Sequence, residues 1–162
     1  MKKRNKYQFG RTSTQRKNGV SHYLLLASDR AMECSPVDFG VPDHGGKRTA
    51  PEQKGIYKLG YSKADGYRSL SYHQVLDDFG RGQALDLVPY IKGVGYCYDA
   101  PGRFGIIGML MLEAWEELQD EGLIPKTLYL HWGGLWSHKD PKKLGWDMAH
   151  YEIRNYPQIG KL

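Results

Sequence analysis

The sequence predicts an α+β fold in which helices pack on a small antiparallel sheet. The chain has 162 residues, of which 40% are hydrophobic and 25% are charged, the size and composition of one folded domain. Helix-like and strand-like segments follow one another without the regular strand–helix–strand alternation of a parallel sheet. No apolar run approaches the roughly 18–20 residues of a membrane-spanning helix. We therefore expect an α+β domain without a transmembrane segment.

The first expected element is a helix that begins near Val20 and ends before Pro36. Apolar residues recur there with a four-three-four-three spacing, which is typical of a helix with one buried face. They are Leu24, Ala27, Ala31 and Cys34.

A short strand and a second helix follow. Apolar and non-apolar residues alternate over residues 37–41, which predicts a strand. Thr49 and Glu52 form a capping-box pattern with Pro51 in the first turn. A helix should therefore start directly after Thr49 and stop at Gly60.

The second half of the chain contains a long loop and four further elements. Residues 60–82 are rich in Gly, Ser, Asp and Tyr, and a loop of that length in a compact domain is usually functional. Strands are expected over 84–88, 127–132 and 149–153, and the best amphipathic helix of the chain over 104–118.

The positive charge is concentrated at the N-terminus. The net charge is +5, yet the first 20 residues hold seven Lys or Arg and no acid, so the rest of the chain is close to neutral. We expect residues 1–18 to form a basic, solvated tail and 19–162 to form the single folded domain. Attraction of the tail to a polyanion is the alternative. Few aromatic residues interleave the tail, so we expect no nucleic-acid partner.

Three segments place a His or an Asp beside strand-like sequence: 71–74, 82–87 and 146–152. Two imidazoles and one carboxylate, from His73, His150 and Asp86, would suit a catalytic zinc site that leaves one position open for water. Spacing alone leaves open whether these are metal ligands or structural side chains. The two cysteines are too few for a Cys-rich zinc site, and neither HExxH nor GxSxG is present.

Alternation along the expected strand over 149–153 places His150 and Glu152 on one face. Asp147 lies just before this strand. It could therefore reach a metal-bound water without being a ligand itself.

Several motifs in order resemble one enzyme family. They are Ser71-Tyr72-His73 with Gly82-Gln83-Ala84-Leu85-Asp86, Trp132-Gly133-Gly134-Leu135-Trp136, Asp147-Met148-Ala149-His150-Tyr151-Glu152, and upstream Val37-Asp38-Phe39 with Gly46-Lys47-Arg48-Thr49 and Gln53. Together they resemble the zinc peptidases that cleave bacterial peptidoglycan stems. This family includes phage L-alanyl-D-glutamate endolysins, D,D-carboxypeptidases and D-Ala-D-Ala dipeptidases. The resemblance implies a hedgehog/D,D-peptidase-like zinc fold.

One spacing departs from the family pattern. The first His usually precedes the Asp by seven positions, whereas thirteen separate His73 from Asp86, as though residues 75–80 were inserted. A hairpin could absorb the insertion and return Asp86 to its place. Alternatively, Asp77 or Asp78 could compete as the ligand, or the added loop could form the rim of the substrate cleft.

The resemblance also implies residue roles. His73, Asp86 and His150 would bind one Zn²⁺ per chain, and Asp147 would act as the general base. Arg48 would stabilise the oxyanion, with a surface ion pair as the alternative. Ser71 and Gln53 would contact substrate, whereas Glu152 would orient a ligand.

The implied function is that of a phage endolysin that hydrolyses the L-Ala–D-Glu bond of peptidoglycan for host lysis. Asp rather than Glu at position 147 favours the endopeptidase over a D,D- or L,D-carboxypeptidase, and a non-catalytic wall-binding module is the remaining alternative. We expect a monomer without stable membrane association. The N-terminus has no apolar signal-peptide core, so we expect the protein in the host cytoplasm until the membrane is permeabilised.

Overall fold

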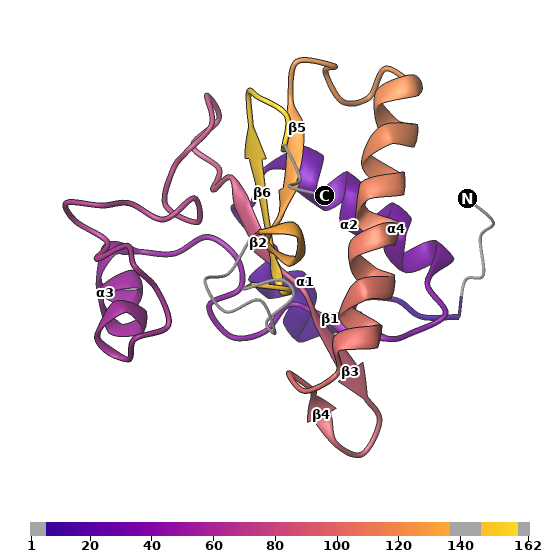
Figure 1. The fold of residues 1–162 in the computed structure, drawn as a ribbon, viewed down its shortest axis with the longest axis horizontal. Helices are drawn as coiled ribbons and strands as arrows, with labels where there is room; N and C mark the ends of the chain where they lie inside the picture. Colours follow the sequence, from indigo (N-terminus) through magenta and orange to yellow (C-terminus); the bar gives the residue numbers. More distant parts are fainter. Residues whose placement is uncertain (1–5, 137–146, 159–162) are drawn as a thin grey trace.

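The computed structural model describes residues 6–136 and 147–158, which form four α-helices and two small sheets (Figure 1). The helices are α1 (Arg11–Arg16), α2 (His22–Cys34), α3 (Ala50–Lys58) and α4 (Pro101–Asp120). One antiparallel sheet has the order β1 (Phe39–Gly40), β3 (Val88–Ile91), β4 (Gly95–Tyr96). The other has the order β2 (Ala84–Asp86), β6 (His150–Arg154), β5 (Tyr129–Trp132), and a 3₁₀ turn, η1 (Gly133–Leu135), follows β5. The predicted α+β class is confirmed.

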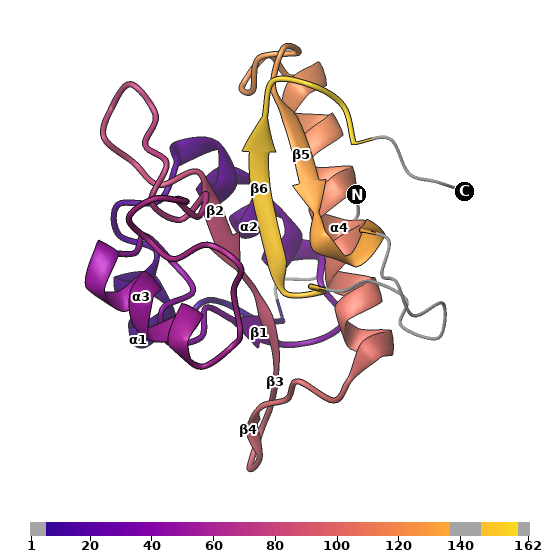
Figure 2. The same ribbon diagram turned by 60° about the vertical axis from the view of Figure 1, so that its left-hand side comes forward.

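Helices α2 and α4 pack against each other and lie behind the β2–β6–β5 sheet in Figure 2. The apolar stripe predicted on α2 is buried, and α4 buries Ile107, Met111 and Leu118 against it. Tyr151 and Ile153 of β6 complete this core. Complete burial of such a side chain contributes about 1.5–3 kcal/mol. None of the described helices is long and apolar enough to cross a membrane.

Helix α3 starts where the capping box predicted. The Thr49 hydroxyl accepts a hydrogen bond from the Glu52 amide, the Glu52 carboxylate accepts one from the Thr49 amide, and Pro51 occupies the first turn. The helix lies away from both sheets (Figure 1). The preceding segment contacts the end of β2, where the Gly45 carbonyl accepts a hydrogen bond from the Asp86 amide.

The strand predicted over 84–88 is two strands in two sheets. Residues up to Asp86 pair with β6, whereas Val88 and Pro89 pair with β1. Apart from Asp86 the run is apolar because both segments are buried, and the change of partner at Leu87 leaves no mark in the pattern. Strand β4, which closes a hairpin with β3, was also not predicted.

The prediction of a solvated tail is wrong for residues 11–17, which belong to the folded domain. Residues 11–16 form α1, and the Ser13 hydroxyl accepts a hydrogen bond from the Val41 amide. Arg16 donates to the Val41 carbonyl at 3.0 Å. The buried Lys17 pairs with Asp29. Residues 1–5 of the predicted tail lie outside the described residues.

Candidate metal centre

Strand pairing brings two predicted ligands together. In the β2–β6 register Asp86 lies opposite His150, so both side chains project from the same face of the sheet. Tyr151 points to the other face, into the core under α2 and α4. His73 comes from the long 60–82 loop and is completely buried beside them.

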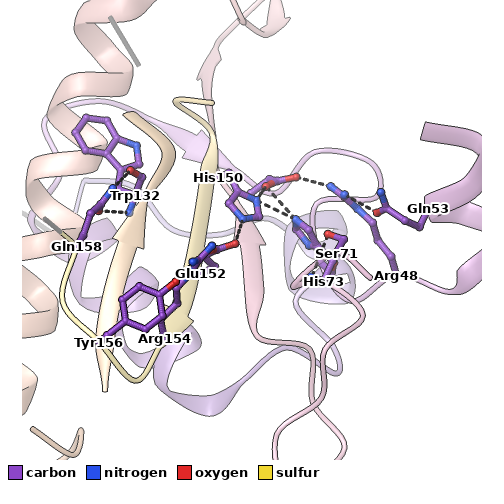
Figure 3. Close-up of polar contacts among 12 residues, drawn as sticks. Arg48, Gln53, Ser71, His73, Trp132, His150, Glu152, Arg154, Tyr156 and Gln158 are labelled. Carbon is purple, nitrogen blue, oxygen red and sulfur yellow. Dashed lines mark hydrogen bonds and ion pairs between the residues drawn. The ribbon is translucent and has the colours of Figure 1, made fainter. Parts of the chain in front are cut away.

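The three ligand atoms form a compact triangle (Figure 3). Nε2 of His73 lies 3.2 Å from Oδ1 of Asp86 and 3.2 Å from Nδ1 of His150, and the latter two atoms are 3.0 Å apart. In a tetrahedral site with ligands at about 2.0–2.1 Å, neighbouring ligands lie roughly 3.3 Å apart. The group therefore fits a single metal ion.

The outer nitrogen of each imidazole is already engaged. Nδ1 of His73 donates to the Gly46 carbonyl at 2.7 Å, and Nε2 of His150 donates to Oε2 of Glu152 at 2.9 Å. Glu152 in turn pairs with Arg154. These contacts orient both rings so that the inner nitrogens converge on the same point as Asp86.

Charge accumulates around the triangle. Burial lowers the pKa of His73 and opposes the charge on His150, but hydrogen bonds to Asp86 and Glu152 raise the pKa of His150 to about 10. Burial also acts to raise the pKa of Asp86, yet His73, His150 and Arg48 hold it well below its usual value. Without a metal, His150 therefore keeps a proton at neutral pH, and its positive charge faces the carboxylates of Asp86 and Glu152.

Arg48 lies against this centre. Its guanidinium donates to Oδ2 of Asp86 at 2.7 Å, to the His44 carbonyl at 2.6 Å and to Oε1 of Gln53 at 3.1 Å. The expected substrate contact of Gln53 is not found, because Gln53 is completely buried and its amide donates to Ser62 and Ala64. Gln53 instead orients Arg48.

The centre opens into a cavity of about 1020 Å³. Arg48, Ser71, Asp86, Asp147 and His150 all line it. Burial, followed by the negative charge of Asp86, raises the pKa of Asp147 to about 6. A carboxyl group with that pKa can exchange protons near neutrality.

The loop between His73 and Asp86 is the expected hairpin. Leu76 and Gly82 pair in an antiparallel bridge, and the Gln83 amide donates to the carbonyls of Tyr72 and Val75. The Asp77 carboxylate accepts from amides within its own turn, so it does not compete with Asp86. No other candidate metal cluster occurs among the described residues.

Close backbone contacts explain two glycines of the sequence motifs. A Cβ on Gly133 would lie 2.1 Å from the Asp147 carbonyl oxygen, and one on Gly46 would lie 2.0 Å from the Arg16 carbonyl oxygen. Only glycine allows these approaches. Gly133 thus places Asp147, and Gly46 places the carbonyl that orients His73.

Sequence reasoning missed Arg154. This residue follows Glu152 by two positions on β6 and lines the same cavity. The period of two that grouped His150 with Glu152 could have identified it. Nε2 of another buried histidine, His131, lies 2.7 Å from the Tyr156 carbonyl oxygen.

Comparison with known proteins finds a similar fold among solved structures. No protein-family model and no curated protein matches the chain. A solved structure, the L-Ala D-Glu endopeptidase ChiX of Serratia marcescens, matches with a TM-score of 0.62 and 23% identity over 92% of both chains. At this identity the match shows that the two proteins share a fold.

Proposed function

We propose that this protein is a zinc peptidase that cleaves the stem peptides of bacterial peptidoglycan. The observation that carries the proposal is the convergence of the buried His73 with Asp86 and His150 beside a cavity that Asp147 and Arg48 also line. The ChiX structure, whose fold this chain shares, belongs to an L-Ala D-Glu endopeptidase.

His73, Asp86 and His150 would hold one Zn²⁺ per chain, and two imidazoles with one carboxylate are a donor set that zinc prefers. A zinc ion in such a site supplies Lewis-acid activation of water and of the scissile carbonyl. Glu152 keeps Nε2 of His150 occupied, so that Nδ1 is the nitrogen available to the metal.

Asp147 would serve as the proton carrier of the reaction. Its raised pKa of about 6 lets it accept a proton from the attacking water and deliver that proton to the leaving amine near neutral pH. Arg48 would stabilise the negative charge that develops on the scissile carbonyl oxygen. Loss of one such donor typically lowers the rate by about 10²–10³.

The L-Ala–D-Glu bond is the scissile bond we propose, in a phage endolysin that lyses its host. The Asp at position 147 and the motifs that resemble phage endolysins support this choice. Peptidoglycan is then the partner, a monomer is the active form, and the enzyme waits in the host cytoplasm until the membrane is permeabilised.

Digestion of purified peptidoglycan tests this function. The zinc-loaded protein should create new N-terminal D-Glu groups, identified by mass spectrometry of the released fragments. Release of D-Ala instead would indicate a D,D- or L,D-carboxypeptidase. Binding to peptidoglycan without new termini would indicate a wall-binding module.

An Arg48→Ala variant and an Arg81→Ala variant make a matched pair for this assay. Arg48 contacts Asp86, whereas Arg81 lies on the exposed hairpin. The first change should lower hydrolysis by about 10²–10³ and the second should leave it unchanged. Equal activities would remove Arg48 from the mechanism.

A further inference from the structure

Arg154 extends the metal centre along β6. Its side chain lines the cavity, and Glu152 connects it to His150 (Figure 3). Beyond its pairing with Glu152, this guanidinium has no role in the proposed reaction. Its position in the substrate cavity raises the question of what it binds there.

The guanidinium of Arg154 is held in a fixed orientation. Oε1 of the buried Glu152 accepts from Nε at 2.5 Å and also pairs with Nη2, while Nη1 donates to the Tyr156 hydroxyl. The ring centroids of Tyr72 and Tyr156 lie 4.8 Å and 5.3 Å from Cζ of Arg154. A cation fixed in this way loses little conformational entropy when it binds a ligand.

Two donors of this guanidinium remain. Arginine has five N–H groups, and the contacts above use three of them. One N–H on each terminal nitrogen therefore has no partner among the described residues. Such a pair matches the two oxygens of a carboxylate, which accept bidentate hydrogen bonds from arginine.

The other two cations of the cavity are less suited to this task. Arg48 also uses one N–H of each nitrogen, but one of its partners is Asp86, a proposed metal ligand, and it already has the proposed role of stabilising the scissile carbonyl oxygen. Lys63 is exposed and offers a point charge rather than a planar fork. Arg154 is thus the planar cavity cation that contacts none of the proposed metal ligands and has no part in the proposed reaction.

The proposed substrate contains such a group. A glutamyl residue inside a peptide uses one of its two carboxyl groups for the next bond and keeps the other free. We propose that Arg154 binds this free carboxylate of the D-Glu residue and so selects an acidic residue on the amine side of the scissile bond. This inference rests on the proposed function.

Two synthetic stem peptides test the inference, one with the free D-Glu carboxylate and one with the carboxamide in its place. The zinc-loaded protein should cleave the carboxylate peptide with a kcat/KM roughly 10- to 100-fold higher, the range for hydrogen bonds to charged groups. In Arg154→Met this preference should fall to within about threefold of unity. Lys63→Met is the matched control, because it removes another cavity cation and should retain the preference.

The ratio of kcat/KM for the two peptides distinguishes a loss of carboxylate binding from a general disturbance of the site. Arg154 also contacts Glu152, so its loss can disturb His150 and reduce cleavage of both peptides by the same factor. Such a uniform loss with an unchanged ratio would overturn the inference. Arg154→Lys should keep part of the preference, because it retains the charge but not the paired donors.

Calorimetric binding of both peptides to zinc-loaded Asp147→Asn protein makes the result independent of hydrolysis. The Asp147→Asn protein should bind the carboxylate peptide more tightly than the carboxamide peptide, and the Asp147→Asn, Arg154→Met double variant should bind both equally. This result supports the inference even if the wild-type protein cleaves neither peptide. If the wild-type protein cleaves both peptides while binding and cleavage ignore the carboxylate, the inference fails and the proposed function stands. If the protein neither distinguishes nor cleaves them, both are wrong.

Discussion

The carboxylate of Glu152 lies 2.9 Å from Nε2 of His150, and this contact determines which imidazole nitrogen faces Asp86 and His73. Glu152 is itself buried and paired with Arg154. The orientation of one ligand therefore depends on an ion pair that does not touch the metal position.

Replacing Glu152 by Gln should weaken zinc binding by about 10- to 100-fold. The amide oxygen still accepts a hydrogen bond from His150, but it lacks the negative charge that makes the imidazole of His150 more basic. Competition with a chromophoric chelator measures the affinity. Glu116→Gln, on the exposed side of α4, is the matched control. Equal affinities in the two variants would contradict the role of Glu152.

Metal uptake should release a proton. The pKa of His150 is raised to about 10, so at neutral pH its Nδ1 carries a proton that a metal must displace. Below that pKa the apparent zinc affinity should rise about tenfold for each pH unit. Calorimetry in buffers of different ionisation enthalpy between pH 6.5 and 8 counts the protons released, and an affinity independent of pH would refute the assignment.

Activity should fall in acid as Asp147 becomes protonated. The pKa of Asp147 is raised to about 6, and the base form is present above that value, so kcat/KM should rise through about pH 6 and then level. Asp147→Asn should lower kcat by about 10²–10⁴ while zinc content stays near one per chain. Asp43→Asn, at another carboxylate that lines the cavity, should keep the wild-type pH profile.

Gly46→Ala should destabilise the fold and the site together. The new Cβ would lie 2.0 Å from the Arg16 carbonyl oxygen, so the segment that holds His73 must shift. We expect a loss of about 1–3 kcal/mol in the free energy of unfolding, measured by urea denaturation. Gly55→Ala in α3 has nothing within 4 Å of its Cβ and should instead gain roughly 0.5–1 kcal/mol.

Removing residues 2–5 and removing residues 2–17 should have different effects. The longer deletion takes away the Ser13 and Lys17 contacts described above, so its thermal unfolding midpoint should fall by several degrees. The shorter deletion should leave that midpoint unchanged. Equal midpoints would show that α1 contributes nothing to the domain.

Local patterns predicted most of the elements in this chain. Helix α3 was predicted from the capping box at Thr49, and α2 from its apolar stripe. Both signals depend on neighbours within one helical turn. Relationships between distant segments were not predicted. The change of sheet at Leu87 and the packing of α1 on Val41 depend on contacts that no local periodicity encodes.

The candidate site shows the same division. The motifs brought His73, Asp86 and His150 together correctly despite the longer spacing. Gln53 was assigned to substrate because a motif gives a residue's position in the chain but not the direction of its side chain. Arg154 was missed because the expected strand ended at residue 153, one residue before it. Its contacts with Glu152, Tyr72 and Tyr156 form only in the folded chain.

The hairpin between His73 and Asp86 also offers a practical handle. Its strands meet again at the Leu76–Gly82 bridge, Phe79 at its end is 85% exposed, and nothing lies within 4 Å of a Cβ on Gly80. A peptide epitope or fluorescent reporter inserted between Phe79 and Gly80 would lie outside the domain. The protein could then be followed on cell-wall sacculi with both chain ends left native.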